Sequence, residues 1–385
     1  MSSTVYDFAI IGAGAAGLHL AQTMLADDWF AQKKILVLEK DNKDTDDRTW
    51  SFWEKGTGKW DHLIAKNWGK GQFITNRHNV ELSLFPYKYK MLHAIDFYNY
   101  GKQKLAEAPH LDWIKEEVKT VTTGEIIEIK CSKQTYQAKQ VFDSRIDADF
   151  KNTKDKYHRV IQHFKGWVIE TKEPVFDPTT FVMMDYRLKW KDSTSFTYVL
   201  PTSSHSAMIE FTLFNLEYLE DAEYDRLLKK YIKDILKIDD YTISKVEYGV
   251  IPMSNYPFHK ANQPGIMKIG TAGSWVKPSS GYAFKNIEKM AGKVVENIKQ
   301  GRDPSTNLFN ARFQFYDTLY LGVLSKYNDD GETLFETMYT KNSIQKIFKF
   351  LDEETNILEE IKIMSSFNPK PFLEMLLNET TGIGL

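Results

Sequence analysis

Residues 5–17 read VYDFAIIGAGAAG, and this stretch decides the fold. Its first seven residues are mostly apolar and predict a short buried strand. The glycines that follow match the pattern G-x-G-x-x-G, residues 18–25 predict a helix, and residues 34–39 predict a second strand. A glycine turn between a strand and a helix, in a β-α-β unit of this length, is typical of dinucleotide-binding domains.

Each glycine of the turn has its own physical reason. Gly12 permits the tight turn, Gly14 lets the backbone approach a pyrophosphate, and Gly17 lets the helix pack on the sheet. The helix N-terminus adds N–H donors and partial positive charge. Glu39 follows Gly17 by 22 residues, where its carboxylate can accept both ribose hydroxyls and disfavours a 2′-phosphate. The cofactor contacts expected here are Gly12, Gly14, Ala15, Ala16, Gly17, Glu39 and Lys40.

Two later segments favour FAD over NAD as the dinucleotide. They are VFDSR at residues 141–145 and IGTAG at residues 269–273, the second followed by a predicted helix at 285–299. Flavoproteins use a late strand-glycine-helix segment of this kind to hold the ribityl chain and the flavin edge. Many of them carry an acidic residue where Thr271 stands here. The further cofactor contacts expected are Arg48, Asp143, Gly270, Gly273, Gly281 and Tyr282.

Composition excludes several classes of protein. The chain has 385 residues, which favours two packed units, and its 50 basic and 52 acidic residues give no excess positive charge for nucleic acid. Cys131 is the single cysteine, so an internal disulfide and a multi-thiolate metal site are excluded; we expect no metal. Its alternating surroundings predict a core or surface position on a strand rather than a nucleophile. No apolar run approaches about 18 residues, so we expect a cytoplasmic protein, soluble or at a membrane surface.

The predicted fold is α/β, with a Rossmann-type FAD-binding domain of the hydroxylase-like flavoprotein architecture, an inserted β-rich substrate domain and a helical C-terminal tail. The FAD-binding domain is expected at 1–75, 96–155 and 255–305, the substrate domain at 76–95 and 156–254, and the tail at 306–385. Residues 41–60 are expected to form a loop. Further strands are expected at 73–84, 87–92, 113–121, 124–129, 140–144, 166–171, 180–187, 194–200, 206–214 and 265–270, with helices at 96–108 and 221–236.

Six segments in order along the chain resemble the bacterial FAD-dependent lycopene cyclase family. They are RTWSF at 48–52, MDYR at 184–187, MIEFT at 208–212, EYGVIP at 247–252, the glycine-rich segment 270–282 and FQFYD at 313–317. One departure is Phe211, which stands where the family has a second acidic residue. The text FLDEET at 350–355 is similar to the plant form of the acidic motif, but it lies in the helical tail, and we expect its carboxylates to be solvated.

The resemblance implies acid-catalysed closure of the ends of lycopene to β-ionone rings, an isomerisation that uses reduced FAD without consuming it. NAD(P)H is then expected only as the electron source. Glu210 is the expected acid–base carboxylate, since burial among apolar neighbours would raise its pKa. Glu247 is either its acid–base partner or a structural brace.

Several other roles stay open between two interpretations. Asp185 and Arg187 either orient the pocket wall or form a structural ion pair. Trp50, Phe52, Trp275 and Tyr282 either line the polyene pocket or pack in the core. The tail segments 361–364 and 371–377 either dock on the inner membrane surface, where lycopene resides, or pack on the parent domain. Competing functions are an FAD-dependent hydroxylase or polyprenyl reductase, and a non-enzymatic prenyl-lipid carrier on the same fold.

Overall fold

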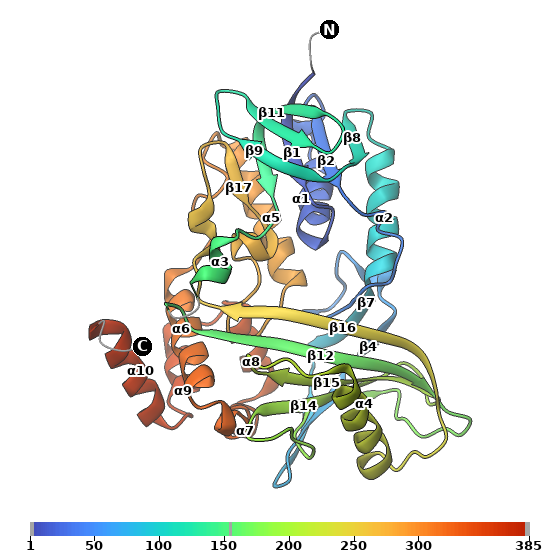
Figure 1. The fold of residues 1–385 in the computed structure, drawn as a ribbon. Helices are drawn as coiled ribbons and strands as arrows, with labels where there is room; N and C mark the ends of the chain where they lie inside the picture. The colour runs from blue at the N-terminus through green and yellow to red at the C-terminus, as the bar shows by residue number, and fades with distance from the viewer. Residues whose placement is uncertain (1–3, 154–155, 382–385) are drawn as a thin grey trace. The chain divides into compact units, whose positions relative to one another are not determined.

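The computed structural model describes residues 4–153 and 156–381, and the chain divides into two compact units. Unit 1 comprises Met1–Asp46, His93–Lys154 and Tyr256–Ala311. Unit 2 comprises Asp47–Leu92, Asp155–Asn255 and Arg312–Leu385. Figure 1 labels many of the elements of both units.

Unit 1 is built on a seven-stranded sheet whose order is β8-β2-β1-β11-β10-β9, with β17 beside β11. The pairs β8–β2, β2–β1, β1–β11 and β11–β17 are parallel, whereas β10 and β9 extend the sheet in antiparallel pairing. All five residues of β2 are buried, as expected for a strand inside a parallel sheet. The strands are β1 (Val5–Ile11), β2 (Ile35–Glu39), β8 (Leu111–Lys115), β9 (Val118–Thr122), β10 (Ile127–Cys131), β11 (Thr135–Asp143) and β17 (Ile266–Lys268).

The helices of unit 1 include the one that follows the glycine turn. Helix α1 packs against both α5 and α2. These helices are α1 (Ala15–Leu25), α2 (Ala94–Ala106), α3 (Asp149–Asn152) and α5 (Phe284–Lys299). The predicted β-α-β unit at residues 5–39 is therefore confirmed.

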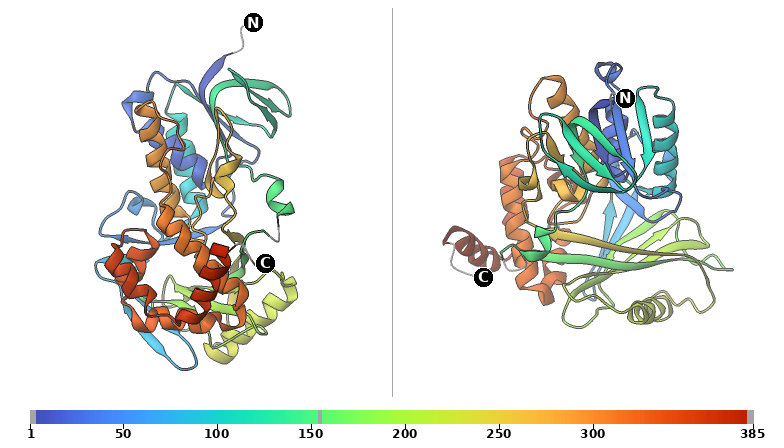
Figure 2. Two further views of the ribbon diagram at one scale, coloured as in Figure 1. Left: turned by 90° about the vertical axis from the view of Figure 1, so that its left-hand side faces the viewer. Right: turned by 45° about the horizontal axis from the view of Figure 1, so that its top comes forward.

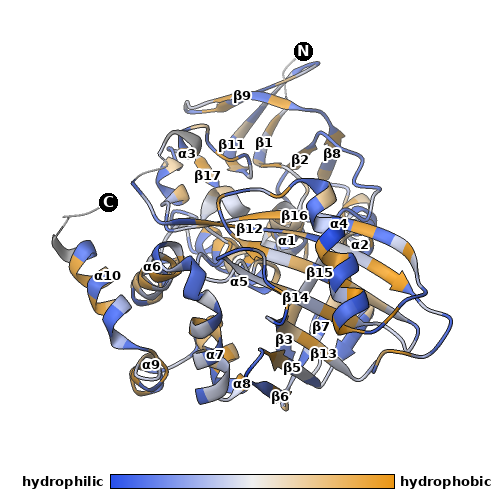
Figure 3. Cartoon of the chain, turned by 60° about the horizontal axis from the view of Figure 1, so that its bottom comes forward, coloured by the Kyte–Doolittle hydropathy of each residue, from blue (hydrophilic) through white to orange (hydrophobic). Residues whose placement is uncertain are grey.

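Unit 2 contains a second seven-stranded sheet, of order β16-β12-β15-β14-β13-β5-β6. Helix α4 (Asp221–Lys230) covers one face, and a π-helical turn, Tyr231–Ile235, continues it. Figure 3 shows hydrophilic and apolar bands along α4, as expected for a helix that buries one side on a sheet. The strands are β5 (Lys70–Ile74), β6 (Asn79–Ser83), β12 (Arg159–Glu170), β13 (Thr180–Asp185), β14 (Thr194–Pro201), β15 (Ser206–Phe214) and β16 (Thr242–Ser254).

The rest of unit 2 is a small sheet and a group of helices. The small sheet has the order β3-β7-β4. Figure 2 shows the C-terminal helices, in orange and red, gathered together. These elements are β3 (Thr49–Lys55), β4 (Lys66–Trp68), β7 (Tyr87–His93), α6 (Ala311–Lys326), α7 (Gly331–Lys341), α8 (Ile344–Leu351), α9 (Ile357–Met364) and α10 (Pro369–Thr381). In the described part of the chain, every helix is too short or too polar to cross a bilayer.

Two expectations about residues 41–84 differ from the structure. The expected loop at 41–60 contains strand β3, and the expected strand at 73–84 is a hairpin of β5 and β6. Residues 47–75 group with unit 2 rather than with the nucleotide-binding unit, because β4 pairs with β7 and β5 pairs with β13. Residues 312–381 are mainly helical as expected, and they too group with unit 2.

A buried carboxylate explains why the helical tail belongs to unit 2. Glu336 on α7 accepts hydrogen bonds from the Thr75 hydroxyl at 2.8 Å and from the Arg77 side chain, and it lies 2.7 Å from the His78 ring. These contacts join α7 to the β5–β6 turn. Cys131 is buried at the end of β10, where burial raises the pKa of its thiol to about 11. Of the core and surface positions expected for it, the structure shows the core position.

Candidate functional site

The glycine turn of unit 1 leaves no room for side chains at two of its three glycines. Gly12 has φ +94°, and a Cβ there would lie 2.1 Å from the Ser144 Oγ. A Cβ on Gly17 would lie 1.9 Å from the Gly12 carbonyl oxygen, so any side chain would push the helix away from the turn. Gly14, in contrast, faces open space. The backbone of the turn is therefore uncovered at Gly14, where no other atom of the described residues lies close.

The start of α1 has no capping side chain and no acidic residue in its first turn. Its N–H donors are thus available to an anion. Glu39, at the end of β2, accepts from the Ala13 N–H at 2.6 Å and from the Asp41 N–H at 3.0 Å. These bonds fix the buried carboxylate beside the turn. Lys40 is exposed directly after it.

The late glycine segment of unit 1 lies against the same helix. Gly270 begins the 3-10 turn η5 (Gly270–Gly273), and a Cβ on it would lie 2.9 Å from the Ala16 Cβ. Nearby, three buried polar atoms have no hydrogen-bond partner among the described residues: Ser274 Oγ, the Trp275 Nε1 and Ser280 Oγ. Buried polar groups normally have partners, so these atoms indicate room for a polar ligand. Neither serine was among the predicted contacts, although both stand in the glycine-rich segment 270–282.

These features fit the dinucleotide part of FAD. A bare glycine turn and an uncapped helix suit a pyrophosphate, and Glu39 lies where a ribose is bound in such folds. The orphaned atoms of residues 274–280, together with the turn at Gly281 (φ +72°) and Tyr282, would supply polar contacts to the rest of the cofactor. The start of α1 and the 3-10 turn η5, which both contain predicted contact residues, therefore lie against each other.

Two predicted cofactor contacts have other partners. Asp143 is buried, and it accepts from Arg145 Nε at 2.9 Å and from the Lys268 ammonium at 3.0 Å. Burial alone would raise the pKa of Asp143, but Arg145 and Lys268 outweigh it and lower that pKa. Arg48 is exposed, pairs with Asp47 at 3.3 Å and belongs to unit 2.

In unit 2, the two predicted acid–base carboxylates share one row of the large sheet. Glu247 on β16 is paired with Gly166 on β12, and Gly166 is paired with Glu210 on β15. Directly opposed residues of neighbouring antiparallel strands project from the same face. Glu210 and Glu247 therefore lie on one face, with only a glycine between them.

Glu210 is held in its protonated form near neutral pH. Its side chain is buried, and the Thr212 hydroxyl donates to its Oε1 at 2.9 Å. Burial, and after it the negative charge of Glu247, raise the pKa of Glu210 to about 8, and the Thr212 hydrogen bond opposes them only weakly. A carboxyl group of this kind can deliver a proton at physiological pH.

Both carboxylate oxygens of Glu247 accept hydrogen bonds from Thr49. The backbone N–H of Thr49 donates to its Oε1 at 2.6 Å, and the Thr49 hydroxyl donates to its Oε2 at 2.7 Å. The Lys245 ammonium lies 3.4 Å from the same carboxylate. Thr49 is a further functional candidate that was not among the predicted residues, although it stands in the segment RTWSF at 48–52.

The structure explains the departure at Phe211. Its ring points to the opposite face of the sheet, where it is fully buried in a cluster with Trp167, Ile209 and Leu228 of α4. A carboxylate there would be buried in an apolar core. Strand β15 can therefore place one acidic residue, Glu210, on the face that Glu247 shares.

Asp185 and Arg187 have the contacts of a structural ion pair. Asp185 is fully buried and accepts from the Arg187 Nε at 2.9 Å and from the Tyr231 hydroxyl at 2.7 Å. Tyr231 belongs to the turn that follows α4, so the carboxylate ties β13 to that turn. This geometry favours the structural alternative for both residues.

We expect Asp185→Ala to lower the free energy of unfolding by about 3–5 kcal/mol, because Arg187 and the Tyr231 hydroxyl lose their buried partner. Urea denaturation of the purified variant would measure this. The matched control is Asp240→Ala, which removes an exposed partner of Lys172 and should have little effect. Equal effects of the two substitutions would contradict the assignment.

The predicted aromatic residues are divided between the units. Trp50 and Phe52 lie on β3 in unit 2, the first half-buried and the second buried, and Trp275 and Tyr282 belong to unit 1. In the segment at 350–355, Glu354 is exposed as expected, whereas the expected solvation is wrong for Asp352. Asp352 accepts a hydrogen bond at 2.8 Å from the indole of Trp53, which is buried.

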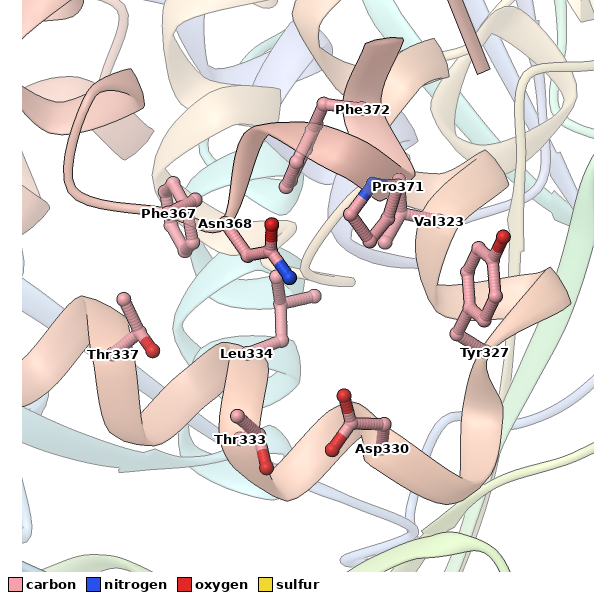
Figure 4. A pocket seen from close by; sticks show the side chains of 10 residues that line it. All are labelled: Val323, Tyr327, Asp330, Thr333, Leu334, Thr337, Phe367, Asn368, Pro371 and Phe372. Carbon is pink, nitrogen blue, oxygen red and sulfur yellow. The ribbon is translucent and has the colours of Figure 1, made fainter. Parts of the chain in front are cut away.

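One pocket in unit 2 lies apart from all of these residues (Figure 4). It encloses about 70 Å³. Sites for organic ligands usually measure about 300–1,000 Å³, so this pocket is too small for a polyene. It is lined by Val323, Tyr327, Asp330, Thr333, Leu334, Thr337, Phe367, Asn368, Pro371 and Phe372.

Sequence comparison identifies the family. A sequence profile described as "Lycopene cyclase protein" matches residues 7–377, which is nearly the whole chain. The chain belongs to the lycopene cyclase family. Among curated proteins, it is similar to a lycopene beta cyclase from Synechococcus elongatus, with 22% identity over 327 residues that cover 80% of this chain and 75% of the relative.

Solved structures confirm the flavoprotein architecture of this lycopene cyclase family member. A geranylgeranyl bacteriochlorophyll reductase-like protein from Thermoplasma acidophilum matches with a TM-score of 0.67 at 14% identity, covering 98% of this chain and 100% of that one. A flavin-dependent brominase matches at 0.59 with 15% identity and the same coverage. A p-nitrophenol 4-monooxygenase from Pseudomonas putida matches at 0.59 with 14% identity, covering 98% of both chains.

Proposed function

We infer that this protein closes the ends of lycopene into β-ionone rings, with Glu210 and Glu247 as its proton-transfer groups and FAD as its cofactor. The observation that carries this proposal is the carboxylate pair on one face of β15 and β16, with one member protonated and the other fixed as an acceptor. Family membership supports the carotenoid substrate, and the curated relative supports the β ring.

Ring closure needs one proton in and one proton out. The Glu210 carboxyl group would add its proton to a terminal double bond, which leaves a tertiary carbocation on the substrate. An internal double bond attacks this cation and forms the new C–C bond of the ring. Loss of a neighbouring proton to a carboxylate, Glu247 or the ionised Glu210, restores a double bond. The product is an isomer of the substrate, so no electrons are consumed.

Unit 1 would hold FAD through the glycine turn, Glu39 and the segment from Gly270 to Tyr282. Bound in its reduced form, FAD would supply negative charge that stabilises a cation. NAD(P)H would then serve only to reduce it.

Expression in a bacterium that accumulates lycopene tests the proposal. We expect conversion of the red pigment to cyclic carotenes, together with purified protein that is yellow with bound flavin. Persistent lycopene beside well-expressed, flavin-loaded protein would defeat it.

A flavin-dependent hydroxylase or polyprenyl reductase is the alternative that shares this fold, as the structural neighbours illustrate. It would consume NAD(P)H in step with product, whereas a cyclase needs only enough to reduce its flavin once. A prenyl-lipid carrier would bind lycopene without changing it. Measuring both the NAD(P)H oxidised and the lycopene converted by the purified protein distinguishes the three.

We also propose that helix α9 contacts the cytoplasmic surface of the membrane that dissolves the substrate. Ile357, Leu358, Ile361 and Met364 are exposed, and they recur at the spacing of one helix side. Leu373 and Leu377 on α10 are exposed as well, and Figure 3 shows apolar bands on this helix. An exposed apolar stripe on a helix is typical of proteins that lie on a bilayer.

We expect the double variant Leu358→Asp/Ile361→Asp to lose binding to phosphatidylcholine vesicles, because two apolar contacts become charged. Co-sedimentation with the vesicles measures this. The control is Leu216→Asp, at an exposed leucine that belongs to neither α9 nor α10. Undiminished binding of the double variant would refute the assignment of α9.

A further inference from the structure

An aromatic residue lies beside the row of paired residues Glu247, Gly166 and Glu210. Phe164 precedes Gly166 by two residues on β12, so its side chain projects from the face of the sheet that carries both carboxylates. Its direct partner on β16 is Gly249, which follows Glu247 by two residues. Two residues of a strand span about 7 Å, so Phe164 belongs to the row next to the two carboxylates.

The ring of Phe164 lies over Gly249. A Cβ on Gly249 would be 2.0 Å from the Cζ atom of this ring, closer than any real contact. The ring therefore occupies the place that a side chain at position 249 would need, and it leans toward β16, the strand that carries Glu247. Gly249 stands in the segment EYGVIP at 247–252. The need for glycine at this position is steric, and it comes from Phe164.

Phe164 differs from a second phenylalanine on this face. Phe196 on β14 is fully buried, and its ring contacts those of Tyr186 and Phe214. Phe164 is only half-buried. Strand β12 lies inside the sheet, between β16 and β15, so the exposed part of Phe164 belongs to its side chain. Part of this ring is therefore accessible on the face that both carboxylates share.

A ring in this place suits the charge that the reaction creates. The face of an aromatic ring attracts a cation that lies within about 6 Å of its centre. The proposed proton transfer from Glu210 leaves a tertiary carbocation on the substrate. A cation held between the carboxylate row and the Phe164 ring would be within this range, because the two rows are about 7 Å apart. Neutral lycopene carries no such charge, so the ring would favour the cation over the bound substrate.

We propose that Phe164 is a further catalytic residue of the candidate site, whose ring stabilises the carbocation, and that Gly249 is the positioning residue that gives this ring its place. The inference rests on the proposed cyclisation. It adds to the two carboxylates a group that neither carries charge nor transfers a proton.

Fluorinated phenylalanines test the role of the ring with little change in its size. Fluorine withdraws electrons from the ring face, so one, two and three fluorine atoms at position 164 should progressively weaken its attraction for a cation. We expect the rate constant of ring closure, measured in a single turnover with flavin-loaded protein, to fall stepwise to about tenfold below that of the wild type. The KM for lycopene, the thermal midpoint and the flavin content should not change.

The matched control is the same series at Phe214. This ring is buried on the same face of the sheet, and it lies about 13 Å from Glu210 along β15. Fluorine at this position should leave the rate of ring closure unchanged.

The variant Gly249→Ala tests the positioning role. Its methyl group takes the place of the ring tip, so Phe164 must turn away, and we expect ring closure to slow by about tenfold. Phe164→Leu has no ring to displace. The double variant Phe164→Leu/Gly249→Ala should therefore close the ring about as fast as Phe164→Leu alone.

The two roles fail on separate results. The catalytic role of Phe164 is overturned if three fluorine atoms at position 164 leave the rate of ring closure unchanged, or if the series at Phe214 lowers it equally. Additive effects of Gly249→Ala and Phe164→Leu would overturn the positioning role of Gly249. Wild-type protein that leaves lycopene unchanged would instead defeat the proposed function itself.

Discussion

Replacing Glu210 with glutamine should lower kcat for lycopene cyclisation by about 10²- to 10⁴-fold, the usual contribution of a positioned general acid. Glutamine keeps the size of the side chain and its hydrogen bond with Thr212, but it has no acidic proton to give to the double bond. The pH dependence of kcat for the wild-type protein should show the same requirement for a protonated Glu210. The active, protonated form of Glu210 is lost as pH rises through about 8, so kcat should fall above that pH.

The control for this experiment is Glu81→Gln, which changes an exposed glutamate on β6 of the same sheet and should leave activity unchanged. Flavin absorbance of each purified variant shows whether unit 1 is intact. If Glu210→Gln cyclises lycopene at the wild-type rate and Glu247→Gln does not, the proton donor must be Glu247. Pigment analysis together with steady-state kinetics separates these outcomes.

Local sequence patterns predicted the nucleotide-binding unit well. The strand, glycine turn, helix and acidic strand end of residues 5–39 all depend on neighbours in sequence, and the structure reproduces them. Strand β3 escaped prediction because its segment TWSFWEK has no regular alternation of apolar and polar residues. Its pairing with β7 is made by residues about forty positions away, which no local pattern reveals.

The candidate site could be predicted only in part. Glu210 and Glu247 were selected by resemblance, and their shared face depends on the register of β16, β12 and β15. Thr49 was missed because its partner Glu247 is 198 residues away along the chain. The proposed division between a proton donor and an acceptor likewise rests on burial and contacts that only the folded sheet creates.

The stability of the protein should reveal the protonated Glu210 without any assay of activity. Below about pH 4.5 this carboxyl group is protonated in the folded and the unfolded chain alike, so it contributes no pH dependence. Between about pH 4.5 and about pH 8 the unfolded chain releases the proton while the folded chain retains it. As pH rises, the free energy of unfolding therefore falls by about 1.36 kcal/mol per pH unit, on the order of 5 kcal/mol in all. Above that range this group causes no further change in the free energy of unfolding.

Urea denaturation of the wild type and of Glu210→Gln between about pH 4 and about pH 9 measures this effect, because the glutamine variant lacks the titration. Relative to that variant, the wild type should become progressively less stable up to about pH 8. The charged and titratable groups that influence Glu210 are Glu247 with its neighbour Lys245, and Tyr224 of α4, and all are present in both proteins. The free energy of unfolding of Glu81→Gln should have the same pH dependence as that of the wild type. A constant difference between wild type and Glu210→Gln across the whole range would mean that Glu210 ionises like an exposed glutamate, and the acid role assigned to it would then have no physical basis.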